Sequence, residues 1–392
     1  MSKGGGLASV STAQETRGVK GSDGGDAVGT PLCFIGGIFS AMEEPKTKQH
    51  HRYVDYFKAL LMLLVIIAHI NFANQAIKPW IYAFLMPAFF FASGMLVKPP
   101  PMASVRECGS LMWRKFTALM FPYFLWAIIY ASLNGRNLLL ILYGSHKSLL
   151  KADTLSSLWF LPVLFDAMAF LLLAQMALKE RLNLPVKVCL CVVSFCIAPF
   201  LPHFGPGYPW CLDVAFAAFG FLLMGNILHP LILRVQRASE SSGRVLSIWF
   251  AVAVATLAAT VLFKLSNPQF GVALMAEARY GNFLLFLLAS FLETAFVLSA
   301  SILLDRLVPK DVSPKVDLLA FIGKNTLCVL VVHKPFIKAC HAVFRRIHVP
   351  DAIALTVTFA VTAMASCLLA LFIHHFFPAL VGKTPCGKRE MK

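Results

Sequence analysis

The feature that most constrains this 392-residue chain is a series of long apolar runs separated by short polar or basic stretches. Hydrophobic residues make up 58% of the chain, charged residues make up 14%, and the mean hydropathy is +0.73. A bilayer is crossed by about 20 apolar residues in a helix. The pattern therefore predicts an all-α, polytopic membrane protein with about ten transmembrane helices, near residues 57–73, 80–97, 116–134, 158–178, 188–202, 211–228, 248–264, 282–303, 325–343 and 352–373.

The formal net charge of +16 raises the question of nucleic-acid binding. The basic residues punctuate the apolar runs and form no long basic arm, so we expect a lipid bilayer as partner and no nucleic acid. Most of these Lys and Arg residues lie in the segments that would face the same side of the membrane as the N-terminus. By the positive-inside rule this predicts that both termini are cytoplasmic, in a membrane that the sequence does not identify.

Three segments follow from the composition. Residues 1–49 are rich in Gly, Ser and Thr and predict a disordered cytoplasmic tail, residues 50–380 form the membrane domain, and residues 381–392 form a short basic cytoplasmic tail. The ten cysteines include no CxxC pair, and several lie within apolar runs. They are more typical of packing residues than of a zinc site or a disulfide framework.

The stretch from Arg52 to Leu96 contains ionisable residues within and next to the first apolar run. On a helix, Asp55, Lys58 and His69 lie within roughly 40° of one line, with His69 about 16 Å beyond Lys58. An ionisable residue inside a membrane span indicates function, whereas residues at a helix end also serve as anchors. Asp55 and Lys58 could be anchors at a helix end. His69 is harder to explain as an anchor, because it lies deeper in the apolar run.

Five segments in order carry a resemblance to a known family. They are D-x-x-K followed by ten residues and His69, MPAFFFASG at 86–94, RKFTALMFPYFLW at 114–126, LWFLPVLF at 158–165 and FIGKNTLCVLVVHKPFI at 321–337. Over roughly residues 50–380 this order and spacing resemble acyltransferase family 3, the integral membrane O-acyltransferases. Lys58 stands where the family usually has Arg, as in the branch resembling fucose and glucan O-acetyltransferases.

The resemblance implies a ten-helix enzyme that takes an acyl group, commonly acetyl, from a cytoplasmic acyl-CoA. The group is delivered to a hydroxyl of a sugar, a glycan or a lipid-linked acceptor. Acyl-CoA would be a donor substrate, with no permanently bound cofactor and no metal. Lys58 keeps the positive charge of the usual Arg without its planar fork, so we expect it to act as a point-charge partner of Asp55 or of a phosphate.

Acyl transfer from a thioester to an alcohol needs a base that takes the hydroxyl proton. His69 is the predicted base, against the alternative of a structural histidine hydrogen-bonded between helices. His333 is the second histidine inside an apolar run, and it could stabilise the oxyanion or orient His69. Lys334 and Lys338 beside it also fit a wet helix end.

Four further residues are candidates for binding. Arg114 and Lys115 lie at the predicted cytoplasmic entrance of the third span, where they could meet the phosphates of coenzyme A or simply follow the positive-inside rule. Trp159 could line the acyl or acceptor pocket or be an interfacial tryptophan. Glu293, in the middle of the eighth span, could pair with a base or line the substrate path.

Two alternatives remain at this point. A proton- or ion-coupled secondary transporter would use Asp166, Glu293 and His69 as a relay, but we find no matching halves with broken spans. A non-catalytic membrane scaffold would have no need of both His69 and His333.

Overall fold

A computed structural model describes residues 51–71, 78–98, 104–135, 137–150, 153–202, 205–241, 243–267, 273–309, 317–347 and 349–381. The predicted tails, 1–49 and 381–392, lie outside this part of the chain except for Val381. The described residues form helices and no strand, which confirms the all-α prediction. The helices are α2 Arg52–His69, α3 Lys78–Tyr82, α4 Leu85–Leu96, α5 Val105–Leu133, α6 Leu139–Tyr143, α7 His146–Leu149, α8 Phe160–Leu178, α9 Leu184–Ile197, α10 Leu212–Ser241, α11 Val245–Ser266, α12 Phe283–Leu307, α13 Leu318–Lys324, α14 Thr326–Ile347 and α15 Asp351–Phe376.

Seven of the described helices, α5, α8, α10, α11, α12, α14 and α15, are long and apolar enough to cross a membrane. Two shorter apolar segments, Trp80–Leu96 and Leu184–Phe200, fall below that length. The remaining predicted run coincides with α2, whose 18 residues include three charged side chains near its start. Every predicted run therefore contains helix, while the number of ten spans stays a prediction.

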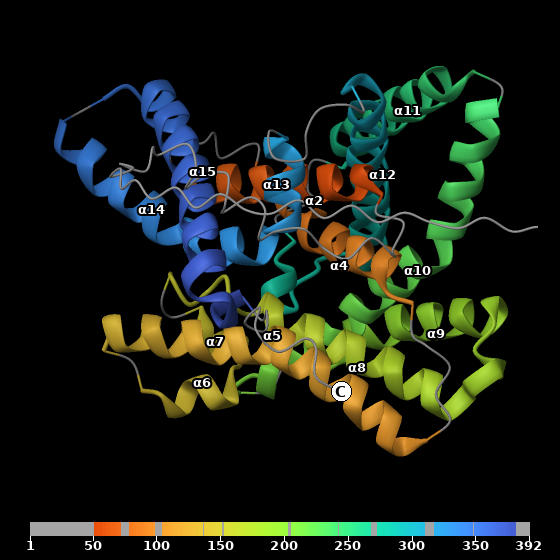
Figure 1. Cartoon of the computed structure of the whole chain (residues 1–392), viewed down its shortest axis with the longest axis horizontal. Helices are drawn as coiled ribbons and strands as arrows, with labels where there is room; N and C mark the ends of the chain where they lie inside the picture. The colour runs from red at the N-terminus through yellow and green to blue at the C-terminus, as the bar shows by residue number, and fades with distance from the viewer. Residues whose placement is uncertain are drawn as a thin grey trace, which may run out of the picture. The chain divides into compact units, whose positions relative to one another are not determined.

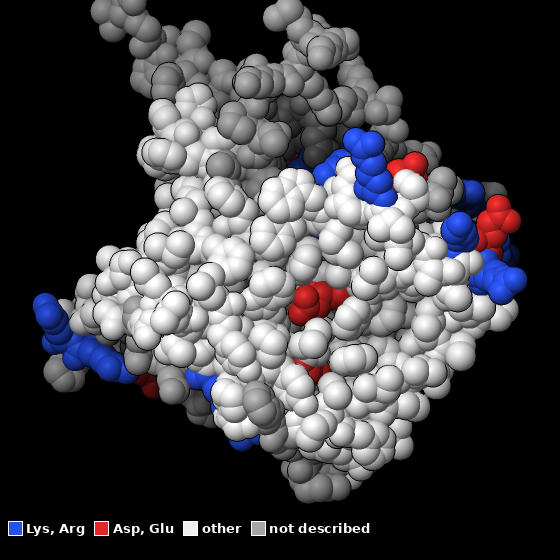
Figure 2. All heavy atoms as spheres, turned by 90° about the horizontal axis from the view of Figure 1, so that it is seen from below, with Lys and Arg blue, Asp and Glu red and all other residues white. Residues whose placement is uncertain are grey.

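The surface agrees with a bilayer environment. Figure 2 shows a face whose middle is uncharged apart from small acidic patches, with most Lys and Arg side chains along its margins. The helix α11 is the most exposed of the seven, since only 17% of its apolar window is buried. An apolar helix that the protein leaves uncovered is suited to contact with lipid chains.

Helix α2 occupies the interior of the bundle (Figure 1). It packs against α4, α12, α13, α14 and α15, so elements from both ends of the described chain meet on it. Its apolar side chains cover most of its circumference, and Tyr56, Phe57, Leu61 and Met62 are fully buried. A helix that is apolar nearly all round belongs in the core of a large protein. Arg52 fixes its first turn by donating to the Asp305 carboxylate at 2.5 Å.

The crossing of α4 and α10 depends on two glycines. A Cβ on Gly94 would overlap the carbonyl oxygen of Leu222, and a Cβ on Gly225 would overlap that of Phe91. Small residues let helix backbones approach closely in membrane proteins. Gly94 and Gly225 therefore allow the two helices to cross in backbone contact, and the neighbouring Ser93 hydroxyl donates to the Phe89 carbonyl at 2.9 Å.

We expect Gly94→Ala and Gly225→Ala each to destabilise the protein, because the methyl group would force apart two backbones in contact. The expected loss is roughly 1–3 kcal/mol in the free energy of unfolding. Gly109→Ala on α5 is the matched control, since nothing lies within 4 Å of its added Cβ. Denaturant unfolding of the full chain in detergent measures all three. Equal stability of Gly109→Ala and Gly225→Ala would contradict the close crossing.

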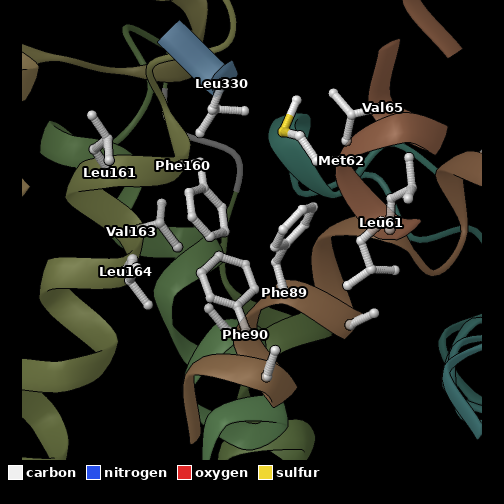
Figure 3. Packing of buried hydrophobic residues seen from close by; sticks show 14 of the residues in the cluster. Leu61, Met62, Val65, Phe89, Phe90, Phe160, Leu161, Val163, Leu164 and Leu330 are labelled. Carbon is white, nitrogen blue, oxygen red and sulfur yellow. The ribbon is translucent and has the colours of Figure 1, made fainter. Parts of the chain in front are cut away.

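Figure 3 shows the apolar cluster that joins α2, α4, α8 and α14. The Phe90 and Phe160 rings lie 4.9 Å apart between centroids, and the Phe89 and Phe160 rings lie 5.9 Å apart. Leu330 enters the same cluster from α14, and Val65 enters it from α2. Tight packing leaves little freedom for the helices that carry these residues. The backbones at Val65 and Leu330 are thus held by the core.

Candidate active site

The structure brings the two predicted histidines together. His69 is the last residue of α2 and His333 lies in the first half of α14, and their ring centroids are 5.1 Å apart at an interplanar angle of 73°. His333 is fully buried, whereas His69 is only partly buried. Two imidazoles from segments 264 positions apart therefore share one site at the junction of α2 and α14.

Backbone carbonyls determine which nitrogen of each ring carries the proton. The Nδ1 of His69 lies 2.8 Å from the Val65 oxygen, and the Nδ1 of His333 lies 2.8 Å from the Leu330 oxygen. A carbonyl oxygen only accepts hydrogen bonds, so both Nδ1 atoms donate. In the neutral ring Nε2 is then the basic nitrogen. The Nε2 of His333 is buried and has no hydrogen-bond partner among the described residues.

Two tyrosines support the helix segments that carry the pair. Pro335 has no N–H, which leaves the Val331 carbonyl without its usual helical partner. The Tyr130 hydroxyl of α5 donates to that oxygen at 2.6 Å. At the end of α2 the last carbonyls also lack helical partners. The Tyr82 hydroxyl donates to the Ala68 oxygen at 3.1 Å.

Lys334 follows His333 and is buried, which is costly for an ammonium group unless it has partners. Its Nζ lies 3.1 Å from the Asp153 carboxylate, and it also donates to the Ser156 hydroxyl. Both partners belong to the connection before α8. Lys334 therefore ties α14 to that connection rather than marking an open, wet helix end.

Asp55 and Lys58 form an ion pair of 3.1 Å near the start of α2, where Asp55 is buried. The Asp55 backbone is in close contact with Gly323 of α13. Lys58 precedes His69 by eleven residues, or about 16 Å along the helix. The structure pairs these two residues as expected and does not bring them to the histidines.

Arg114 and Lys115 lie in the first half of α5, with Arg114 exposed and Lys115 partly buried. Tyr130, which contacts α14 near His333, is sixteen residues after Arg114, or about 24 Å further along the helix. The two basic residues are therefore remote from the imidazoles. A role at the reacting atoms is excluded for them, and a role toward a distant part of a long donor stays a prediction.

Trp159 and Glu293 are both buried. Trp159 is 6% exposed and its ring packs near those of Phe90 and Phe160, so it belongs to the same apolar core cluster as these two residues. Glu293 of α12 lies 3.3 Å from the Lys264 ammonium of α11. That ammonium also lies 5.5 Å from the Trp80 ring centre. Glu293 therefore has a cationic partner, one that sequence reasoning did not find.

Sequence reasoning missed Tyr82, Tyr130, Lys334 and Asp153 as parts of the site. One signal was present, because Pro335 inside a helix leaves a carbonyl that requires a donor from elsewhere. The partners themselves come from other helices, and no spacing within the chain indicates them. Among the described residues, no group of three or more His, Cys, Asp or Glu side chains could hold a metal ion.

A bundle of apolar helices, seven of them long enough to cross a bilayer among the described residues, defines a polytopic membrane protein. A family model described as an acyltransferase domain matches residues 51–375, and the chain belongs to this family, acyltransferase family 3. The protein is thus a membrane acyltransferase. Comparison with curated proteins and with solved structures finds no significant match.

Proposed function

We propose that this acyltransferase is an O-acyltransferase, which moves an acetyl group from acetyl-CoA to a hydroxyl of a sugar, a glycan or a lipid-linked acceptor. The observation that carries the proposal is the His69–His333 pair, with both Nδ1 atoms engaged by backbone carbonyls. Such a pair offers a basic Nε2 in a buried setting. An alcohol needs that group to become a nucleophile near neutral pH.

His69 is the proposed base because it is the less buried of the two rings. Its Nε2 takes the proton of the acceptor hydroxyl while the hydroxyl oxygen attacks the thioester carbon. The tetrahedral intermediate collapses with cleavage of the carbon–sulfur bond, and the departing thiolate takes the proton from the imidazolium. The products are the O-acetyl ester and coenzyme A, and the base is returned to its starting form.

His333 is proposed to orient His69 and to assist the proton transfer. The alternative that it stabilises the oxyanion requires a proton on Nε2, because an oxyanion accepts hydrogen bonds. A neutral ring that already donates from Nδ1 has a lone pair at Nε2 instead. The ring contact with His69 therefore favours the orienting role.

The remaining predicted site residues are proposed to act at a distance from the two histidines. We propose that the donor approaches from the cytoplasm, with its phosphates near Arg114 and Lys115 and the point charge of Lys58 on the same side. Glu293 and Trp159 are proposed to shape the substrate path by positioning helices. Glu293 links α12 to α11, and Trp159 packs between α4 and α8. The transporter alternative is set aside, because the family is one of acyltransferases.

The test uses full-length protein in purified membranes, incubated with acetyl-CoA labelled in the acetyl group or, separately, in the coenzyme. We expect acetyl label in a product that mild alkali or hydroxylamine releases, because O-esters are cleaved under these conditions and amides are not. Coenzyme label should appear as free thiol in equal amount.

Membranes that lack the protein are the blank for this measurement. Label in an alkali-stable product would indicate N-acyl transfer. Free thiol without any labelled acceptor would indicate thioester hydrolysis. Either result would contradict O-acyl transfer.

A further inference from the structure

Helix α14 carries a line of basic side chains, of which all but Lys334 lie outside the candidate site. Lys334, Lys338, His341 and Arg345 recur at intervals of four, three and four residues. At about 100° per residue they fall within about 60° of one line, over about 16 Å of helix. We call these four residues the basic stripe. It begins directly beside His333.

The stripe is connected to His69 as well as to His333. The backbone N–H of Asn71, two residues after His69, donates to the Nε2 of His341 at 3.3 Å. The stripe thus runs past the end of α2 that carries His69, away from the end that carries the Asp55–Lys58 pair.

The charges of the stripe are only partly compensated. Lys334 has the Asp153 carboxylate, but Lys338 and Arg345 are exposed and have no hydrogen bond or ion pair with any residue that the structure describes. Membrane topology does not account for them either. In the predicted orientation this end of α14 faces the non-cytoplasmic side, where the positive-inside rule disfavours Lys and Arg.

We infer that the basic stripe binds an anionic group on the acceptor, so that the acceptor is an acidic sugar bearing a carboxylate or a phosphate. Lysine and arginine side chains are the usual protein partners of both groups. The anion would lie against Lys338 and Arg345 while the hydroxyl of the same sugar reaches His69. This inference rests on the proposed function and names the acceptor class for that site.

The test measures binding of three matched probes to the full-length protein in phosphatidylcholine nanodiscs by calorimetry, without acyl donor. The probes are p-nitrophenyl β-D-glucuronide, p-nitrophenyl β-D-glucoside 6-phosphate and neutral p-nitrophenyl β-D-glucoside. We expect both anionic probes to bind at least about tenfold more tightly than the neutral one, as is typical of charge-assisted hydrogen bonds. The double variant Lys338→Gln/Arg345→Gln should lose this difference, and Lys338→Arg/Arg345→Lys should retain it.

Arg279→Gln is the control, because it removes one exposed positive charge from the connection between α11 and α12, away from the stripe. It should leave the preference unchanged. Equal binding of the three probes, or a preference that survives the double glutamine variant, would overturn the inference. So would a double variant that changes only the retention of added phosphatidylglycerol, since the stripe would then bind lipid head groups.

Because no acyl donor is present, binding is read independently of turnover. Failure of the labelled acetyl assay with intact probe binding would count against the proposed reaction and not against the acidic ligand.

Discussion

Replacing His69 by alanine is expected to lower the turnover number of acyl transfer by about 10²–10⁴-fold, because the acceptor hydroxyl would lose its base. The imidazole is held in one tautomer by the Val65 carbonyl, so only Nε2 is available for the proton. Glutamine at the same position should be equally inactive, since its side chain fills the space without accepting a proton near neutral pH. The measurement is the rate of labelled O-ester formation at matched amounts of inserted protein.

His375→Ala supplies the control for the loss of an imidazole, because His375 is exposed near the end of α15. It should turn over at the rate of the wild type. Residues that act as a unit show non-additive losses. We therefore expect His69→Ala/His333→Ala to be hardly slower than His69→Ala alone. Full activity of His69→Ala would refute the assignment of the base.

Replacing Lys264 by methionine is expected to cost about 3–5 kcal/mol in the free energy of unfolding, because the Glu293 carboxylate would stay buried without its partner. The side chains of Lys264 and Glu293 are each only 6% exposed. The double variant Lys264→Met/Glu293→Leu should recover most of this loss, since a buried pair and an apolar pair of similar size are often equally stable. Thermal and denaturant unfolding of the full chain in detergent would measure both.

The Arg279–Glu277 pair is the control, because its side chains are 61% and 31% exposed. Exposed ion pairs contribute little, so Arg279→Gln should change stability by less than about 1 kcal/mol. A Lys264→Met variant as stable as the wild type would show that Glu293 does not depend on the ammonium. That result would favour the proposed role of Glu293 along the substrate path.

Sequence reasoning found the long helices well because each of them coincides with a long apolar run. The runs near 248–264 and 352–373 correspond to α11 Val245–Ser266 and α15 Asp351–Phe376. It missed α13 Leu318–Lys324, which is too short for a span. That helix is capped by the Asp317 side chain and lies close against α2 through Gly323. Short helices of this kind are stabilised by packing more than by their own sequence.

For the site, the sequence indicated which residues carry acid–base chemistry. It did not indicate which residues from other segments contact them. His69 and His333 stand out because imidazoles are uncommon inside apolar runs. The remote position of Arg114 and Lys115 follows from the length of α5, whereas the partners of Lys334 and Glu293 belong to other segments. A carboxylate such as Asp153 appears in the sequence only as an ordinary loop residue.

The sequence by itself indicated an all-helical, multi-pass membrane acyltransferase with two histidines inside apolar runs. Hydropathy, helical spacing and family motifs are properties of short stretches of chain, so they can be read without coordinates. Only the tertiary structure decided that α2 lies at the centre and that the two imidazoles meet. It also decided that Lys334 and Glu293 are neutralised by remote partners. These contacts join residues far apart in the chain, and close packing of whole helices selects them.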